Sequence, residues 1–280
     1  MSCKNVAIIK YENILNCKLF KNLTIGIDPK LFTSEQIKSY FSKNNKIKEI
    51  DQNLVDAVHN KNSYNSKPFF SLHEDIVGKN HLTKIKKISY FLKKNKSDFL
   101  FISAPENVAW LLNIRGFDNP NSPIPNCRLL MNSKGKFFLI SKKAAARKLI
   151  FERKLMNNQI IDPANFKKFL NKFKNGKIVI DKKSCSLFYE KIIQEKFIII
   201  KEEDPIYHFK SIKNPIEIEG MINSHLLDGV ALTKFLYWIK KINKKKITEF
   251  QAQKKLENFR KLNKNYLYPS FDTIAGSGKN

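Results

Sequence analysis

The sequence has few of the residues that mark specialised classes of protein. Only 4 Cys occur among its 280 residues, Cys3, Cys17, Cys127 and Cys185, and none forms a C-x-x-C pair. This spacing argues against a zinc ribbon and against a disulfide scaffold. No apolar run approaches the ~20 residues that cross a bilayer, and the N-terminus lacks the apolar core of a signal peptide. We therefore expect a cytoplasmic protein without a membrane partner.

Arginine and acidic residues are also scarce. Lys and Arg number 52 against 25 Asp and Glu, for a formal net charge of +27, yet only five of the 52 are Arg. Proteins that read nucleic acids favour Arg, because its guanidinium binds guanine and phosphate through two parallel hydrogen bonds. The lysines are spread along the whole chain beside many Asn and Ile, a profile typical of AT-rich genomes. We expect no nucleic-acid function, and keep a nucleic-acid binder as an alternative that steep salt dependence of binding would reveal.

The chain nonetheless has enough apolar residues for a packed core, with 42% hydrophobic residues and 22 Phe. Its pattern falls into three blocks. In the first block, alternation over residues 23–28 predicts a strand, residues 34–43 a helix capped by Ser34, and residues 47–50 a second strand. The polar stretch 60–67, NKNSYNSK, indicates a linker.

The second block, about residues 78–205, alternates between strands and helices. We predict strands at 98–104, 128–131, 136–140, 177–181 and 197–201, and helices at 83–95, 105–114, 142–155, 164–173 and 187–195. Pro105 at the first turn of its helix fits this assignment. Such alternation is typical of a sheet covered by helices, so we expect a compact α/β domain with a mixed sheet that folds alone.

The third block is helical. Asn214 as the cap, proline at the first position and Glu217 at the third form a strong helix start. Thr248 is expected to cap a second helix over residues 249–262, with Phe250, Leu256 and Phe259 facing inward. Seven residues recur at spacings of three and four and predict one long amphipathic helix: Ile218, Ile222, His225, Gly229, Leu232, Leu236 and Ile239.

Residues suited to catalysis are sparse. His225 falls on the apolar helix face, where a packing role is more common than a ligand role, and Asp228 lies within its reach. Two side chains do not make a metal site, which needs three or four ligands. Four other histidines are expected to be structural or exposed: His59, His73, His81 and His208. The residues alone therefore indicate no catalytic and no metal-binding site.

Several segments are similar, in chain order, to motifs of one enzyme family. Residues 108–116, VAWLLNIRG, with Asp118 resemble a middle-domain motif, AWLlNlRGxD. The other matching segments are 25–29 and 53–56 at the tail of the first domain, 207–221 at the opening of the catalytic domain, 224–232 in its first long helix and 271–280, FDTIAGSGKN, at an S-G-x-N turn. Together they resemble the Xaa-Pro aminopeptidases (aminopeptidase P) of the creatinase, or pita-bread, metallopeptidase family.

The resemblance implies an α/β fold in three parts. Residues 1–66 would be the tail of a first creatinase N-terminal-like domain, 67–205 a second such domain, and 206–280 the truncated start of a pita-bread metallopeptidase domain. The chain is then expected to be an internal fragment of a cytoplasmic enzyme, a homodimer when full length. That enzyme would release the N-terminal residue from peptides with proline at the second position.

The resemblance also implies a cofactor and candidate site residues. The family binds a pair of Mn²⁺ ions, alternatively Co²⁺ or Zn²⁺, that acidify a bridging water and polarise the scissile carbonyl. Those ligands would follow residue 280, so the fragment alone is expected to bind no metal and to be inactive. Four residues are candidates for binding substrate: Arg115, Gly276, Gly278 and Asn280. Arg115 either holds a carboxylate inside its own domain or faces the active-site mouth of this or a neighbouring subunit.

The chain departs from the family pattern at two places. His59 and the following Asn-Lys-Asn replace a usual Trp and Arg-Pro, and Lys279 replaces a usual Pro. Two alternatives within the same fold stay open. One is a metal-free pita-bread binding module, and the other is a creatinase-like hydrolase that acts on a small C–N substrate.

Overall fold

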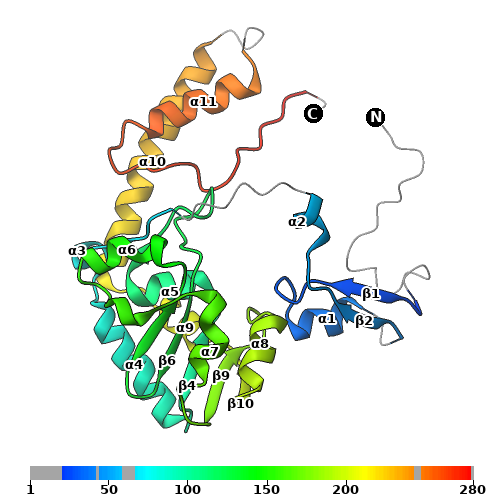
Figure 1. Ribbon diagram of the computed structural model, residues 1–280. Helices are drawn as coiled ribbons and strands as arrows, with labels where there is room; N and C mark the ends of the chain where they lie inside the picture. The colour runs from blue at the N-terminus through cyan, green and yellow to red at the C-terminus, as the bar shows by residue number, and fades with distance from the viewer. Residues whose placement is uncertain (1–20, 42–43, 59–66, 243–246, 279–280) are drawn as a thin grey trace.

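A six-stranded mixed sheet forms the centre of the structure, a computed structural model that describes residues 21–41, 44–58, 67–242 and 247–278 (Figure 1). The strand order is β10-β9-β4-β6-β7-β8. The neighbours β10-β9, β9-β4 and β7-β8 run parallel, while β4-β6 and β6-β7 run antiparallel. The strands are β4 (Phe99–Ile102), β6 (Arg128–Asn132), β7 (Phe137–Ile140), β8 (Ile160–Ile161), β9 (Lys177–Asp181) and β10 (Ile198–Glu202).

Helices cover both faces of this sheet, as Figure 1 shows. Side chains alternate across β4, so that Leu100 and Ile102 join one apolar cluster and Phe101 joins the other. The first cluster packs under α4 (His81–Lys94), α5 (Pro105–Leu112) and α6 (Lys143–Phe151). The second packs under α7 (Phe166–Leu170) and α8 (Leu187–Gln194). The predicted mixed sheet with flanking helices is confirmed.

Element boundaries differ from the predictions in two helices of this domain. The helix predicted over 142–155 ends at Phe151, and the one predicted over 164–173 is a 3-10 turn, η4 (Pro163–Asn165), followed by the short α7. Two short strands, β3 (Phe70–Ser71) and β5 (Ile114–Arg115), form a separate antiparallel pair that the sequence pattern did not predict. Two-residue strands are too short for alternation to reveal them.

A small N-terminal unit lies beside α8 (Figure 1). It contains the parallel pair β1 (Thr24–Ile27) and β2 (Lys46–Glu49), the helix α1 (Ser34–Tyr40) between them, and α2 (Leu54–Val58). The predicted cap Ser34 is wrong, because Thr33 caps α1. The Thr33 hydroxyl accepts from Gln36 N at 3.1 Å, and the Gln36 side chain accepts from Thr33 N at 2.9 Å. Most of the expected linker, residues 60–66, lies outside the described residues.

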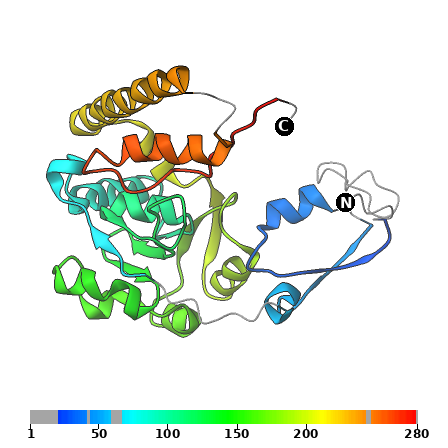
Figure 2. The ribbon, with the colours of Figure 1, turned by 90° about the horizontal axis from the view of Figure 1, so that it is seen from above.

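The C-terminal part is helical, as predicted. Helix α9 (Pro205–Ser211) leads into the long helix α10 (Pro215–Lys241), and α11 (Glu249–Arg260) runs beside it (Figure 2). Asn214 and Thr248 are the caps, as predicted. The predicted inward position of Phe250 is wrong, since that side chain is 59% exposed. No helix in the described part of the chain is both long enough and apolar enough to cross a membrane.

Most of the apolar face predicted on α10 is exposed in the described structure. Of the helix's residues only Ala231 is buried, whereas Ile222 is 55% and Leu226 64% exposed. Figure 1 shows the reason, because α10 and α11 project away from the sheet. His225 is exposed as well, so the packing role predicted for it is not seen.

Candidate functional site

Arg115 lies where the α/β domain meets α10. It follows Asn113, whose left-handed backbone (φ 54°) ends α5 and turns the chain into β5. The half-buried guanidinium donates from Nη1 to the carbonyl oxygens of Ile114 at 2.9 Å and Ala109 at 3.4 Å. Burial lowers the pKa of Arg115, and the negative charge of Glu217 raises it. The acidic group that acts on Arg115 therefore comes from the first turn of α10.

Lys84 is a buried cation in the same region. Only 4% of Lys84 is exposed, and its Nζ donates to Asn113 Oδ1 at 2.6 Å and to the Trp110 carbonyl at 2.9 Å. The ammonium also lies 4.2 Å from the centroid of the Trp110 ring. Burial lowers the pKa of Lys84 to about 8. The negative charge of Glu217 opposes this effect, and the positive charge of Arg115 reinforces it. The negative charge of Glu217 thus acts on two cations of the α/β domain, Lys84 and Arg115.

The sequence analysis missed Lys84. One weak signal was present: Lys84 precedes Ile88 and Leu92 at helical spacings of four, so it falls on the buried face of α4. A charged residue on such a face needs partners. Because the chain is rich in lysine, one lysine on a predicted helix is only a weak signal.

Gly78 and Asn214 form a tight joint at the base of α10. Asn214 is only 8% exposed, caps α10 through its bond with Glu217 N, and donates from Nδ2 to the Val77 carbonyl at 2.9 Å. Gly78 ends α3 (Glu74–Val77) with a left-handed backbone, φ 69°. A Cβ atom at Gly78 would lie 2.3 Å from Asn214 Oδ1, so only glycine fits. The joint fixes where α10 leaves the α/β domain.

The candidate residues Gly276 and Gly278 lie in the exposed C-terminal segment, and Asn280 lies outside the described residues. Gly278 has φ 65°, and a Cβ there would touch nothing within 4 Å. Ser277 N donates to Glu249 Oε1 at 2.6 Å, which fastens the turn to the start of α11. Within the described residues, no hydrogen bond or ion pair joins Arg115 to either glycine.

An aromatic contact brings the same segment to the loop after Arg115. The rings of Phe117 and Tyr268 are 6.2 Å apart, and Phe117 stacks on Phe70 at 5.2 Å. Arg115 and the C-terminal segment therefore lie on one side of the α/β domain, joined by side chains that the sequence analysis did not single out.

The histidines and acidic residues do not form a metal centre in the part of the chain described. Asp228 pairs with Arg260, at 2.6 and 3.2 Å, rather than with His225. His81, expected to be exposed, is half-buried, and burial together with the positive charge of Lys154 lowers its pKa to about 4. No group of three or more His, Cys, Asp or Glu among residues 21–41, 44–58, 67–242 and 247–278 is placed to hold an ion.

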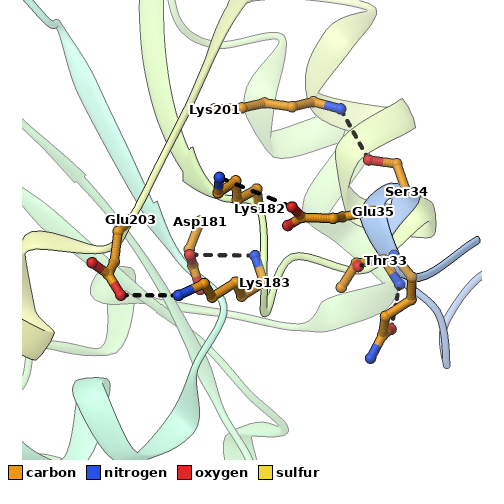
Figure 3. A network of polar contacts seen from close by, with 9 residues as sticks. Thr33, Ser34, Glu35, Asp181, Lys182, Lys183, Lys201 and Glu203 are labelled. Atoms are coloured by element: carbon orange, nitrogen blue, oxygen red, sulfur yellow. Dashed lines mark hydrogen bonds and ion pairs between the residues drawn. The ribbon is translucent and has the colours of Figure 1, made fainter. Parts of the chain in front are cut away.

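A polar network attaches the N-terminal unit to the carboxyl ends of β9 and β10 (Figure 3). Lys201 donates from Nζ to Ser34 Oγ at 3.0 Å and to Glu190 Oε1 at 2.6 Å, while Ser34 Oγ donates to Glu190 Oε2 at 2.9 Å. Lys182 lies 3.9 Å from Glu35. Ligands of open α/β sheets commonly bind at this strand end. Here α1 lies against it, so the edge serves an intramolecular contact.

Comparison with known protein families identifies the family to which the α/β domain belongs. Residues 60–217, more than half of the chain, match the family model of the creatinase/prolidase N-terminal domain. The chain belongs to this family.

Two individual proteins show the sequence similarity in more detail. The chain is 29% identical to Xaa-Pro aminopeptidase 1 of Dictyostelium discoideum over 96% of this chain and 46% of that protein. It is 30% identical to Xaa-Pro aminopeptidase ApepP of Drosophila melanogaster over 94% of this chain and 45% of that protein. The chain thus spans about half the length of the curated relatives it matches.

A solved structure shows the same fold. The X-prolyl aminopeptidase of Caenorhabditis elegans, described as a cytosolic enzyme with a di-nuclear active site, superposes with a TM-score of 0.79 at 23% identity. The superposition covers 98% of this chain and 46% of that chain. The likeness therefore extends from the creatinase-type α/β domain into the helices expected to open a pita-bread domain, and it confirms the predicted fold.

Proposed function

We propose that this chain is part of a cytoplasmic Xaa-Pro aminopeptidase, which hydrolyses the bond between an N-terminal residue and a following proline. The observation that supports this most is the extent of the similarity. Two relatives named as Xaa-Pro aminopeptidases match 96% and 94% of the chain, α/β domain and helical part alike. The proposed substrates are peptides with proline at the second position, and the proposed assembly of the whole protein is a homodimer.

The division of the chain is part of the proposal. Residues 1–66 would end a first creatinase N-terminal-like domain, 67–205 would form the second, and 206–280 would begin the catalytic domain. The exposed apolar face of α10 agrees with this division, because such a face on a long helix ordinarily packs against further protein. The whole enzyme would then supply the surface that covers Ile222 and Leu226.

A divalent metal pair does not fit the residues described here. Their carboxylates and histidines lie apart or pair with cations, as Asp228 does with Arg260. We propose that the whole protein carries the metal pair, Mn²⁺ or alternatively Co²⁺ or Zn²⁺, on ligands outside the described residues. This chain alone is then inactive, and no catalytic step is assigned to its residues.

The proposed contribution of the described residues is to position substrate-binding groups. Asn214 fits against Gly78 and donates to the Val77 carbonyl, so the start of α10 is held to the α/β domain. The negative charge of Glu217 then acts on Arg115 and Lys84. Arg115, Gly276, Gly278 and Asn280 stay candidates for contacts with the peptide. Phe117 and Tyr268 would set the distance between Arg115 and the glycine turn.

The test is the substrate preference of the full-length protein loaded with Mn²⁺. We expect release of the first residue from an Xaa-Pro-Xaa peptide and at least about a hundredfold lower kcat/KM for the matched Xaa-Ala-Xaa peptide. A metal-loaded, folded enzyme that hydrolyses neither peptide but hydrolyses creatine would support the creatinase-like alternative. A folded protein that binds no metal would support the binding module.

A further inference from the structure

A pocket lies at the β7 edge of the large sheet, on a different part of the α/β domain from Arg115. Strand β8 pairs only with Leu139 and Ile140, so the first half of β7 extends beyond it. The turn η3 (Asn157–Gln159) lies beside the first half of β7. There Gln159 Nε2 donates to the Phe137 carbonyl at 3.4 Å, in place of a hydrogen bond from a neighbouring strand. The mismatch in strand length leaves a cavity of about 440 Å³ between β7, η3 and the end of α7. We call this cavity the β7 pocket.

Three phenylalanines form the apolar wall of the β7 pocket. Phe138, Phe169 and Phe173 pack edge to face, with ring centroids 4.7, 5.3 and 5.8 Å apart. Phe138 and Phe169 are buried, at 7% and 8% exposed, and Phe173 is half-buried, so Phe173 is the ring of the three most accessible to a flat ligand. Met156, 68% exposed, also lines the pocket, and its flexible thioether adapts to the shape of a ligand. The pocket is large enough for a small ligand.

The pocket also carries positive charge without a partner. Lys136 Nζ lies 5.4 Å from the Phe138 ring centroid and Lys172 Nζ 5.6 Å from that of Phe169. Within the described residues neither ammonium pairs with a carboxylate, and the lining contains no acidic side chain. Lys167, in the helix α7 that precedes Lys172, does pair with Glu195 at 2.8 Å. Both ammonium groups therefore lie beside the aromatic wall without a carboxylate partner among the described residues.

From these contacts we propose that the β7 pocket binds a small aromatic carboxylate. The flat ring lies against Phe173 and Met156, above the buried rings of Phe138 and Phe169, and the carboxylate accepts hydrogen bonds from Lys136 and Lys172. The charge of the lining selects anionic over cationic rings, and the phenylalanine wall selects rings over acetate. This site is independent of the proposed peptidase function, because none of its residues lies at the junction around Arg115.

The test uses 2-naphthoate as the probe and the 280-residue chain as the protein. Ligand-observed NMR titration is expected to give a Kd on the order of 0.1–1 mM, the affinity typical of a ligand of this size. The cation 2-naphthylmethylammonium and plain acetate are expected to bind at least about tenfold more weakly. Lys172→Glu and Met156→Glu, each exposed and outside the core, should each weaken naphthoate binding by about tenfold.

Two matched controls locate the binding. Lys86→Glu makes the same change of charge on an exposed lysine of α4, and Ile222→Asp alters the exposed face of α10. Both are expected to leave the Kd unchanged. The proposal is overturned if no binding occurs at 5 mM probe, if the cationic ring binds as tightly, or if Ile222→Asp abolishes binding while Lys172→Glu does not.

Discussion

Gly78 is the residue on which the junction depends most. Replacing it with alanine forces a Cβ into the left-handed region and against Asn214 Oδ1, 2.3 Å away. We predict that Gly78→Ala lowers the free energy of unfolding by about 2–3 kcal/mol, from backbone strain and a weakened cap. Urea denaturation measures the change.

Gly220 supplies the matched control for that substitution. It lies inside α10, and a Cβ there would meet nothing within 4 Å. Gly220→Ala should therefore stabilise the protein slightly, by up to about 1 kcal/mol. Equal effects of the two substitutions would contradict the role assigned to the Gly78–Asn214 joint.

The lowered pKa of Lys84 leads us to predict that the stability of the protein depends on pH. The folded protein releases the Lys84 proton near a pKa of about 8, whereas the unfolded chain holds it to about 10.5. Between these values the unfolded state binds more protons, so the contribution of Lys84 to stability rises with pH. We expect the stability difference between wild type and Lys84→Met to shift in favour of wild type from pH 8 to pH 9.5. Urea melts at the two pH values measure it.

The exposed neighbour Lys86 gives the control for this measurement. Lys86→Met should leave the difference constant over the same range, because the tyrosines and cysteines that titrate there are common to both proteins. A Lys84→Met difference that is equally flat would show that the buried ammonium does not titrate as described.

At the scale of elements, five strands of the large sheet were the most predictable features, whereas the two-residue strand β8 was not predicted. Their apolar runs, such as FLFI in β4 and KIVID in β9, are typical of strands covered on both faces. The cap of α1 was not predictable, because Thr33 and Ser34 are adjacent hydroxyl residues that can both cap a helix, and serine is the more common cap. Contacts with Glu190 and Lys201, more than 150 residues away, engage Ser34 instead.

The candidate site was harder to predict, because its residues also interact over long distances in the sequence. Arg115 was identified by its motif, but Glu217 was assigned only to a helix start and Lys84 to no role at all. The effect of Glu217 on the pKa values of Arg115 and Lys84 arises from the tertiary fold, which no local pattern specifies. The caps Asn214 and Thr248, whose hydrogen bonds are local, were predicted correctly.

Helix α10 leads to a prediction at this scale. Because Ile222 and Leu226 are 55% and 64% exposed, their replacement with serine removes little buried surface. We expect Ile222→Ser with Leu226→Ser to change the free energy of unfolding by less than about 0.5 kcal/mol. The same pair should reduce self-association of the chain, measured by sedimentation at increasing concentration. A loss of several kcal/mol would mean that this face is covered in solution.

At the scale of the whole molecule, the N-terminal unit and the α/β domain share a polar interface. Glu190, 8% exposed, accepts from both Ser34 and Lys201. We predict that Glu190→Ala costs about 2 kcal/mol, because Lys201 and Ser34 lose their acceptor. Hydrogen exchange should rise in residues 24–41 but not in β4. Uniform protection across both regions would show that the interface contributes little to docking.

The central claim is that this chain holds the positioning half of a metallo-aminopeptidase and not its metal centre. The most direct measurement is bound metal together with Xaa-Pro hydrolysis, on residues 1–280 and on the full-length protein after incubation with Mn²⁺. We predict no stoichiometric metal and no turnover for the chain, and about two ions with turnover for the full-length protein. Two ions and turnover on residues 1–280 alone would contradict the account.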